Sequence, residues 1–235
     1  MIGRLLDLFW PRVCEVCGRP ADRPGRHVCS DCLMRLPFVP TDGCCRKCGC
    51  DVHRLDGEFL CEDCRVHRPA FDRTASAVRF EGDARKMLLD FKFKRHLWLK
   101  DDFADWLEAA ARARFRTGDI DIVLPLPLKF RRRLDRGYNQ CDYLAAALAE
   151  RLEKPVAKNV LKRVGKPARQ SSLSESERRE NVKGTFAVRR QEPVEGKTVM
   201  VVDDVMTTGS SLSECAKVLK AAGAKRVWCL ALMHS

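Results

Sequence analysis

The fold is decided by the stretch Val199-Met-Val-Val-Asp-Asp-Val-Met-Thr-Thr-Gly-Ser-Ser-Leu212. Its first four residues are apolar and mostly β-branched, which is typical of a strand covered on both faces of a sheet. From Leu212 onward apolar residues recur at helical spacing, so the pattern predicts a strand, a short loop and a helix. A loop of small residues at a helix N-terminus presents backbone N–H groups and the positive end of the helix dipole, and it therefore favours a phosphate.

Two carboxylates stand between this strand and the loop. Asp203 and Asp204 would repel a phosphate unless they held a neutral or cationic group. Ribose hydroxyls are neutral donors, and an ionised carboxylate is a strong acceptor for them. A sugar phosphate therefore satisfies both halves of the motif. The plainer alternative is an acidic strand end before an ordinary helix, with Ser or Thr as its N-cap.

The motif resembles the signature of type I phosphoribosyltransferases, which bind phosphoribosyl pyrophosphate (PRPP). The resemblance implies that Asp203 and Asp204 are the catalytic pair and bind the ribose 2′- and 3′-hydroxyls. It also implies that the loop 207–211 cradles the 5′-phosphate, and Ser211 keeps the hydroxyl that many members supply with Thr. The residues expected to bind PRPP are Asp203, Asp204, Val205, Met206, Thr207, Thr208, Gly209, Ser210 and Ser211.

Two segments near the N-terminus share one cysteine pattern, CxxCG followed by CxDC. Two thiolates at CxxC spacing can occupy two corners of a tetrahedron, and the glycine permits the tight turn between them. We expect about two zinc ions, structural rather than catalytic, because four thiolates close each site. The expected ligands are Cys14, Cys17, Cys29 and Cys32 in the first segment and Cys45, Cys48, Cys61 and Cys64 in the second.

Some features of the cysteine-rich segments stay open. Pairing of the thiolates within each repeat is the simplest assignment, and pairing across the repeats is the alternative. Cys44 and Cys50 break the pattern and are interpreted as spectators, although Cys44 could replace Cys45. Eight well-spaced cysteines leave no ligand vacancy for the three histidines of this part of the chain, which are His27, His53 and His67.

Composition separates this segment from the rest of the chain. Ten of the 13 cysteines lie between Cys14 and Cys64, so we predict a double zinc-ribbon module at 1–68 and a second domain at 69–235. Clustered reduced cysteines fit the cytoplasm, where we expect the protein. No apolar run approaches the ~20 residues that a membrane span needs. The net charge of +12 favours polyanionic partners, either pyrophosphate substrates or nucleic acid.

The second domain alternates predicted strands and helices. This alternation implies an α/β fold, a parallel sheet flanked by helices, with ligands at the carboxyl ends of the strands. The acidic pair and the glycine loop fall at such an end. Strands are expected at 74–80, 120–127, 184–188, 199–202 and 226–233, and helices at 83–93, 98–115, 139–152 and after 211.

Two further segments resemble those of one family. The residues 123–129 and 131–140 are similar to the "VPLP…RRxxRGxNQ" segment of the ComF family, and 169–186 to its "QxxL…RxxNVxGxF" segment. With the cysteine pattern and the PRPP motif, the resemblance covers nearly the whole chain. It implies a PRPP-binding, phosphoribosyltransferase-like protein connected with competence, the uptake of single-stranded DNA.

The same resemblance indicates where pyrophosphate would bind. The loop 125–129 occupies the position of the pyrophosphate loop of type I enzymes, and the polar segment 167–179 is typical of a mobile loop that closes over such a site. A solvated basic face is the alternative for the arginine run. The residues expected to bind pyrophosphate or another anion are Pro125, Leu126, Pro127, Lys129, Arg131, Arg132, Arg133, Arg136, Arg169 and Arg178.

Three functions remain open from the sequence. The first is a phosphoribosyltransferase that uses PRPP and Mg²⁺, with the metal bound mainly through substrate phosphates. The second is a competence factor that binds single-stranded DNA beside DNA-uptake helicase or recombination proteins. The third is a regulator that senses PRPP without turnover. Phe38 and Phe59 are the only aromatics between the first and last zinc-ribbon cysteines, which disfavours base stacking there. No motif selects an acceptor or an oligomeric state.

Overall fold

The computed structural model describes residues 12–50, 60–128, 134–165, 177 and 180–235. Its centre is a four-stranded sheet in the order β1 (Arg73–Arg79), β6 (Arg226–His234), β5 (Thr198–Met206) and β2 (Ile122–Pro125). All three strand pairs are parallel. The α/β fold with a parallel sheet, predicted from the alternating pattern, is confirmed.

Strand β5 is longer than its apolar run suggests. The sequence predicts a strand at 199–202, but β5 continues through the acidic pair to Met206. The reason is its neighbour: β6 offers partners along the whole length, with Asp203 opposite Ala231 and Met206 opposite His234. The two carboxylates are therefore held within a hydrogen-bonded strand.

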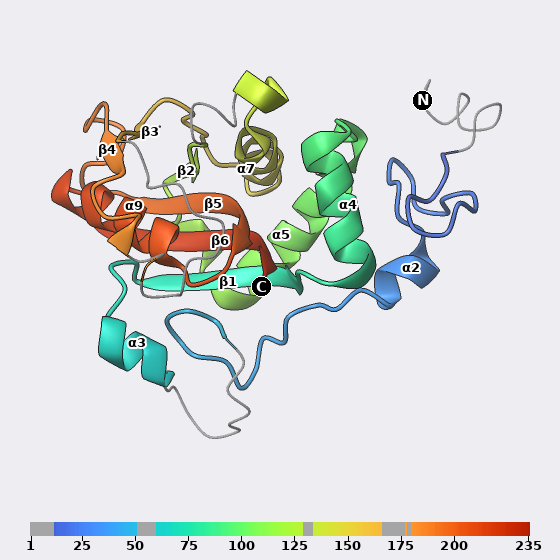
Figure 1. Cartoon of the computed structure of the whole chain (residues 1–235), viewed down its shortest axis with the longest axis horizontal. Coiled ribbons are helices and arrows are strands. Elements are labelled where there is room, and N and C mark those ends of the chain that lie inside the picture. The colour runs from blue at the N-terminus through green and yellow to red at the C-terminus, as the bar shows by residue number, and fades with distance from the viewer. Residues whose placement is uncertain (1–11, 51–59, 129–133, 166–176, 178–179) are drawn as a thin grey trace.

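Helices cover both faces of the sheet (Figure 1). One face carries α4 (Gly82–Phe93), α5 (Lys100–Arg114) and α7 (Gln140–Arg151), and the other carries α9 (Ser210–Ala221). Period-two alternation along a strand explains how β5 serves both layers. Its residues 200 and 202 belong to the first core, and residues 199 and 201 belong to the second. Within the described ranges, no helix combines the length and apolarity that crossing a bilayer requires.

The predicted strand at 184–188 lies outside the main sheet. It forms β4 (Phe186–Val188), which pairs antiparallel with β3 (Leu161–Arg163), a strand that the sequence pattern did not reveal. Phe186 and Leu161 are buried together in the core under α9, and this burial explains why so short a pair forms.

The two cysteine-rich segments contact different parts of the domain. Each contributes a short helix, α2 (Ser30–Met34) and α3 (Glu62–His67), and Figure 1 shows these helices well apart, near the two ends of β1. Two single 3₁₀ turns complete the described elements: η1 (Leu97–Leu99) precedes α5, and η2 (Thr117–Asp119) precedes β2.

Candidate functional site

The loop after β5 has the geometry of an anion site. Gly209 adopts a left-handed φ of 69° and caps α9, a backbone conformation that favours glycine. A Cβ added to Gly209 would lie 3.5 Å from the ring of Phe71. The hydroxyls of Thr208 and Ser210 lie 2.6 Å apart. The first turn of α9 carries no acidic side chain, so the positive end of its dipole is not neutralised there.

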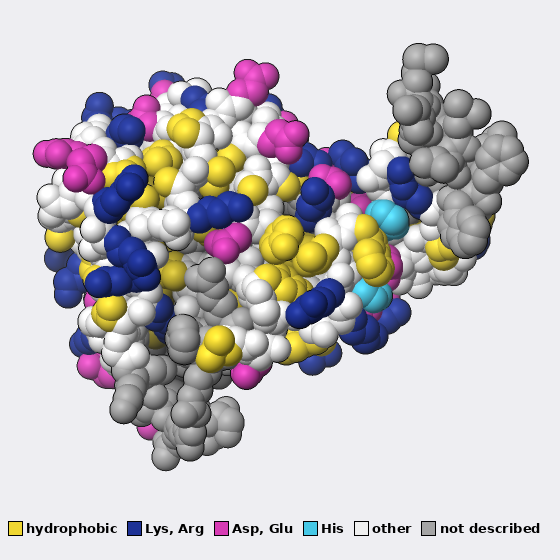
Figure 2. Space-filling model, turned by 90° about the horizontal axis from the view of Figure 1, so that it is seen from above, with side chains coloured by type: hydrophobic (Ala, Val, Ile, Leu, Met, Phe, Trp, Pro, Cys, Tyr) yellow, Lys and Arg dark blue, Asp and Glu magenta, His cyan; other side chains and the backbone are white. Residues whose placement is uncertain are grey.

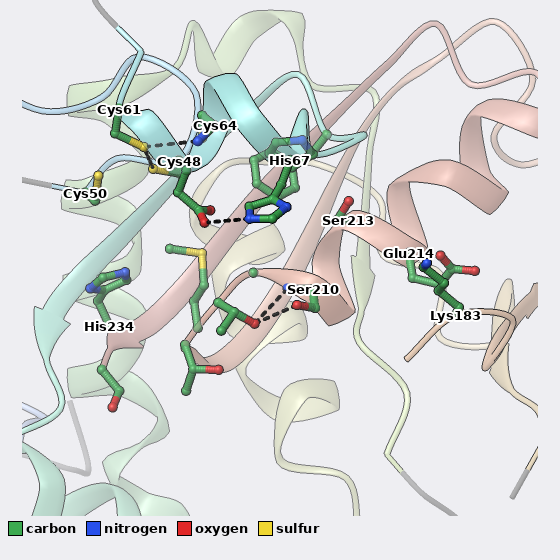
Figure 3. Close-up of a pocket in the computed structure, with 18 of the residues that line it drawn as sticks. Cys48, Cys50, Cys61, Cys64, His67, Lys183, Ser210, Ser213, Glu214 and His234 are labelled. Carbon is green, nitrogen blue, oxygen red and sulfur yellow. Dashed lines mark hydrogen bonds and ion pairs between the residues drawn. The ribbon is translucent and has the colours of Figure 1, made fainter. Parts of the chain in front are cut away.

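This loop borders a cavity of about 540 Å³ (Figure 3). The volume is within the range of ordinary small-molecule pockets. The predicted PRPP residues that line the cavity are Met206, Thr207, Thr208, Gly209 and Ser210.

The opposite wall of the cavity was not predicted from the sequence. It comes from the second cysteine-rich segment and includes Cys48, Cys64 and His67 (Figure 3). Residues separated by more than 140 positions therefore share one cavity. No local pattern in the sequence could show this, because it depends on how the zinc-ribbon segment packs on the sheet.

Asp204 has a dense set of partners. Its side chain is 11% exposed, its Oδ1 lies 2.9 Å from Nζ of Lys92, and Nε2 of Gln140 donates to its Oδ2. Lys92, near the end of α4, was missed by sequence reasoning. Its only signal was a place in the last turn of a predicted helix, which says nothing about a partner more than 100 residues away.

Asp203 is equally buried and has weaker partners. Its Oδ1 accepts the backbone N–H of Asp204 at 2.7 Å and lies 3.7 Å from Sγ of Cys141. Burial, and then the charge of Asp204, raise the pKa of Asp203 to about 7. A ligand that donates hydrogen bonds to the ionised carboxylate would lower this pKa again.

The start of α7 positions Gln140 beside this pair. Asn139 is the N-cap: its side chain accepts the N–H of Cys141 at 3.2 Å and donates to the carbonyl of Leu126 at 3.1 Å. Arg136 donates to Oε1 of Gln140 at 3.0 Å, so a predicted anion-binding residue lies next to the partner of Asp204.

The predicted pyrophosphate loop begins directly beside β5. Pro125 pairs with Val202 in register, and the N–H of Leu126 donates to the carbonyl of Val202 at 2.9 Å, so the loop leaves the sheet next to the acidic pair. Pro127 follows in the same described stretch. The remaining predicted anion-binding residues, Lys129, Arg131, Arg132, Arg133, Arg169 and Arg178, lie outside the described residues.

The first cysteine group fits a tetrahedral zinc site. The sulfurs of Cys14, Cys17, Cys29 and Cys32 all lie within 4.8 Å of one another, and those of Cys17 and Cys29 are 3.8 Å apart. A Zn–S bond of about 2.3 Å gives a tetrahedron edge of about 3.8 Å. The side chain of Arg19 lowers the pKa of Cys17 to about 6, which favours the thiolate that a metal binds.

The second group contains one sulfur more than a site needs. The mutually close sulfurs are those of Cys45, Cys48, Cys50 and Cys61, with Cys48 and Cys61 at 3.6 Å. Cys64, a predicted ligand, is not in this mutually close set, although its backbone N–H donates to Sγ of Cys61 at 3.4 Å. Cys50, interpreted as a spectator from the sequence, is therefore a rival to Cys64 for the fourth position. In both groups the ligands come from one repeat.

Two family models match parts of this chain. Residues 139–235 match the family model described as phosphoribosyl transferase domain, and residues 5–65 match that of the double zinc ribbon domain. The solved adenine phosphoribosyltransferase of Saccharomyces cerevisiae is 16% identical, with 59% of this chain and 72% of that chain covered and a TM-score of 0.38.

Curated relatives extend over almost the whole chain. Competence protein F of Haemophilus influenzae is 32% identical over 211 residues, 87% of this chain and 90% of that protein. The DNA utilization protein YhgH of Salmonella typhimurium is 31% identical over 225 residues, 94% of this chain and 96% of that protein. The chain therefore belongs to the ComF family, the family of Competence protein F, and combines a double zinc ribbon with structural zinc and a phosphoribosyltransferase-type domain.

Proposed function

We propose that this protein binds PRPP, with the 5′-phosphate on the loop 207–211. The observation that carries this proposal is a phosphate-type loop with a left-handed Gly209, at the start of α9 and on the wall of a cavity of about 540 Å³. Backbone N–H groups and hydroxyls would satisfy the phosphate oxygens, and the helix dipole would favour their charge.

The ribose would lie against Asp203 and Asp204. Their carboxylates would accept hydrogen bonds from its 2′- and 3′-hydroxyls, as ionised oxygens do strongly. Lys92 and Gln140 support this role by fixing one carboxylate of the pair. Arg136, which contacts Gln140, would approach the pyrophosphate together with the loop that starts at Pro125. We also propose this role for the anion-binding residues predicted outside the described ranges.

We propose that Mg²⁺ enters with the pyrophosphate rather than at a dedicated protein site. The three-residue group of Cys141, Asp203 and Asp204 brings ligand atoms within 4.8 Å of one another, but a thiol is a poor Mg²⁺ ligand and Asp204 already pairs with Lys92. When bound, the ion neutralises charge on the leaving pyrophosphate. The protein's own part is to hold the ribose, the 5′-phosphate and the leaving group in line.

If turnover occurs, the reaction is transfer of the phosphoribosyl group. The bond from C1 of the ribose to the pyrophosphate oxygen breaks, pyrophosphate leaves with the bonding electrons, and a nucleophile of the acceptor bonds to C1. Positive charge builds on the ring, and the nearby carboxylates would stabilise it. A PRPP-sensing regulator would use the same contacts without releasing pyrophosphate.

A second candidate function is binding of single-stranded DNA. The names of the relatives refer to competence and DNA utilization, and a specific surface supports the idea. Phe93 is 65% exposed, and the guanidinium of Arg136 lies 4.6 Å from the centre of its ring. Figure 2 shows a face on which hydrophobic side chains lie among Lys and Arg side chains. Aromatic rings beside cations stack bases and neutralise phosphates.

This aromatic surface adjoins the acidic pair. Lys92, the partner of Asp204, lines a second cavity of about 500 Å³. The other lining residues are Leu89, Phe93, Arg95, Asp135 and Arg136. A DNA strand on this surface would therefore lie near the proposed ribose site. Helicase or recombination proteins of DNA uptake would be the partners in this second role.

Calorimetry with Mg²⁺ and PRPP tests the first proposal. We expect Asp204→Asn to weaken PRPP binding at least 10-fold, because a charge-assisted hydrogen bond is worth about 1.5–3 kcal/mol. Asp119→Asn is the matched control, since it removes a carboxylate from an exposed pair with Arg226 in the turn before β2. No heat with the wild-type protein would contradict PRPP binding.

Pyrophosphate release separates an enzyme from a regulator. Labelled PRPP, Mg²⁺ and a pooled acceptor library would be incubated with the wild-type protein and with Asp204→Asn. Release by the wild type alone supports the transferase. PRPP binding with release equal to a protein-free control supports the regulator.

A further inference from the structure

The second cysteine-rich segment forms a wall of the cavity that contains the phosphate-type loop. Cys48, Cys64 and His67 line the cavity on one side, and Ser210 lines it on the other (Figure 3). The first cysteine-rich segment contributes no lining residue among those that the structure describes. The two zinc ribbons therefore stand in different relations to the proposed PRPP site.

This wall is fixed to the domain through the edge of the sheet. The N–H of Thr74 in β1 donates to the carbonyl of Lys47 at 2.7 Å. A Cβ on Gly49, which has a φ of 70°, would lie 3.0 Å from the carbonyl oxygen of Thr74. Arg114 donates to the carbonyls of Thr41 and Cys45 at 3.0 Å each. The metal-binding turn thus packs tightly on β1.

The chain that leaves α3 is also tied to the phosphate-binding helix. The N–H of Ala70 donates to Oγ of Ser213 in the first turn of α9 at 3.0 Å. One residue later, Phe71 packs against Gly209. The position of α3 is therefore coupled to the loop through short covalent and hydrogen-bonded paths.

His67, the last residue of α3, is the side chain best suited to reach a ligand on the loop. It is 46% exposed, and Figure 3 shows its ring on the cavity side of α3. Its Nε2 lies 3.6 Å from Oδ1 of Asp63, which is too long for a hydrogen bond. This contact with Asp63 therefore leaves the hydrogen-bonding capacity of the imidazole for a ligand.

The other basic side chains at the cavity are less suitable. Lys183 pairs with Glu180, and both are mostly exposed. His234 is partly buried, and this burial lowers its pKa, which disfavours the cationic form. The first turn of α9 is built from Ser and Leu without Lys or Arg, so a phosphate there would gain a side-chain donor from α3.

We infer that His67 of the second zinc ribbon contacts the 5′-phosphate of a phosphoribosyl ligand bound on the loop 207–211. The inference rests on the proposed function. The zinc ribbon then supplies a ligand-binding residue as well as structural support. The chemical class it recognises is a phosphate monoester, present both in PRPP and in ribose 5-phosphate.

The test is calorimetry of His67→Ala with PRPP and with ribose 5-phosphate. We expect an affinity loss of about 10-fold for both ligands, in line with the loss of one charged-group hydrogen bond. Arg65→Ala is the matched control: it removes a cation from the same helix, and Arg65 is not among the described residues that line the cavity. It should bind both ligands as the wild type does. Equal zinc content and melting temperature establish that the variants are folded.

The outcomes distinguish this inference from the proposed function. No binding by the wild type overturns both. Wild-type affinity in His67→Ala overturns the inference alone, and so does a loss confined to PRPP, because it would place His67 at the pyrophosphate. A double-mutant cycle with Ser210→Ala should show coupling, since both side chains would contact one phosphate. Additive effects would contradict a shared ligand group.

Discussion

The two zinc ribbons share one cysteine pattern but contact different parts of the protein. The first inserts Cys14, Val28 and Cys32 into the core that also contains α4 and α5, and Arg23 pairs with Asp102 at 3.2 Å. The second packs on β1 and lines the cavity beside the phosphate-type loop. A duplicated motif therefore does not imply a duplicated role, because packing decides what each copy can influence.

The largest expected effect is on stability, from the first ribbon. Cys29→Ser should remove one zinc equivalent and lower the melting temperature by roughly 10 °C or more, because structural zinc contributes directly to folding and three of its four expected ligands, Cys14, Cys29 and Cys32, belong to the main core. Scanning calorimetry with metal analysis would measure this. A variant that lost zinc but kept its melting temperature would show that the first ribbon is not structural.

The side chains that attach the two ribbons to the domain, Arg23 and Arg114, should also differ in how much they contribute to the free energy of unfolding. Arg23→Ala leaves Asp102, which is fully buried, without its ion pair, and we expect a loss of about 3 kcal/mol in unfolding free energy. Arg114→Ala removes two hydrogen bonds to carbonyls of the second ribbon and should cost about 1–2 kcal/mol. Urea denaturation would compare them, and the reverse order would contradict the assigned anchors.

The second ribbon should control ligand affinity more than stability. Cys61→Ser stands at the same repeat position as Cys29→Ser, and its sulfur lies 3.6 Å from that of Cys48 on the cavity wall. We expect PRPP affinity to fall about 10-fold as α3 loosens, with a smaller drop in melting temperature than for Cys29→Ser. Titration of PRPP into both variants, at a temperature where each is folded, would measure the difference. Equal affinities would remove the functional distinction between the ribbons.

The smallest expected effect is a pH dependence that belongs to the acidic pair rather than to either ribbon. The pKa of Asp203 is raised to about 7, so the ionised form that we propose accepts the ribose hydroxyls becomes more populated as pH rises. PRPP affinity should therefore increase several-fold between pH 6 and pH 8. Asp203→Asn lacks the titrating carboxyl group, so only the ligand's own titration remains. Its PRPP affinity should therefore depend less on pH than that of the wild type. Cys61→Ser should keep the wild-type profile at lower affinity, and a flattened profile there would link the ribbon to the carboxylates.

Local patterns predicted the parts of this molecule that depend on neighbours in the sequence. The strand, loop and helix around Gly209 and the cysteine spacing of each ribbon are of this kind. Lys92, the cavity wall at His67 and the crowding of Cys50 with Cys64 depend on contacts between distant segments. The extension of β5 through Asp204 likewise depends on β6, which no periodicity in the strand itself reveals. The strand–loop–helix motif of the site could therefore be predicted from the sequence, whereas its distant partners, such as Lys92, are known only from the packing of the fold.

Amide hydrogen exchange with and without Mg²⁺ and PRPP tests whether the phosphate binds on the loop 207–211. We predict slower exchange at 207–213 and at 61–67 when the ligand is present, because backbone N–H groups of the loop would bind the phosphate and α3 would close on it. Exchange at 12–35, in the first ribbon, should not change. Ligand binding without any protection at 207–211 would contradict the proposal that the phosphate lies on this loop.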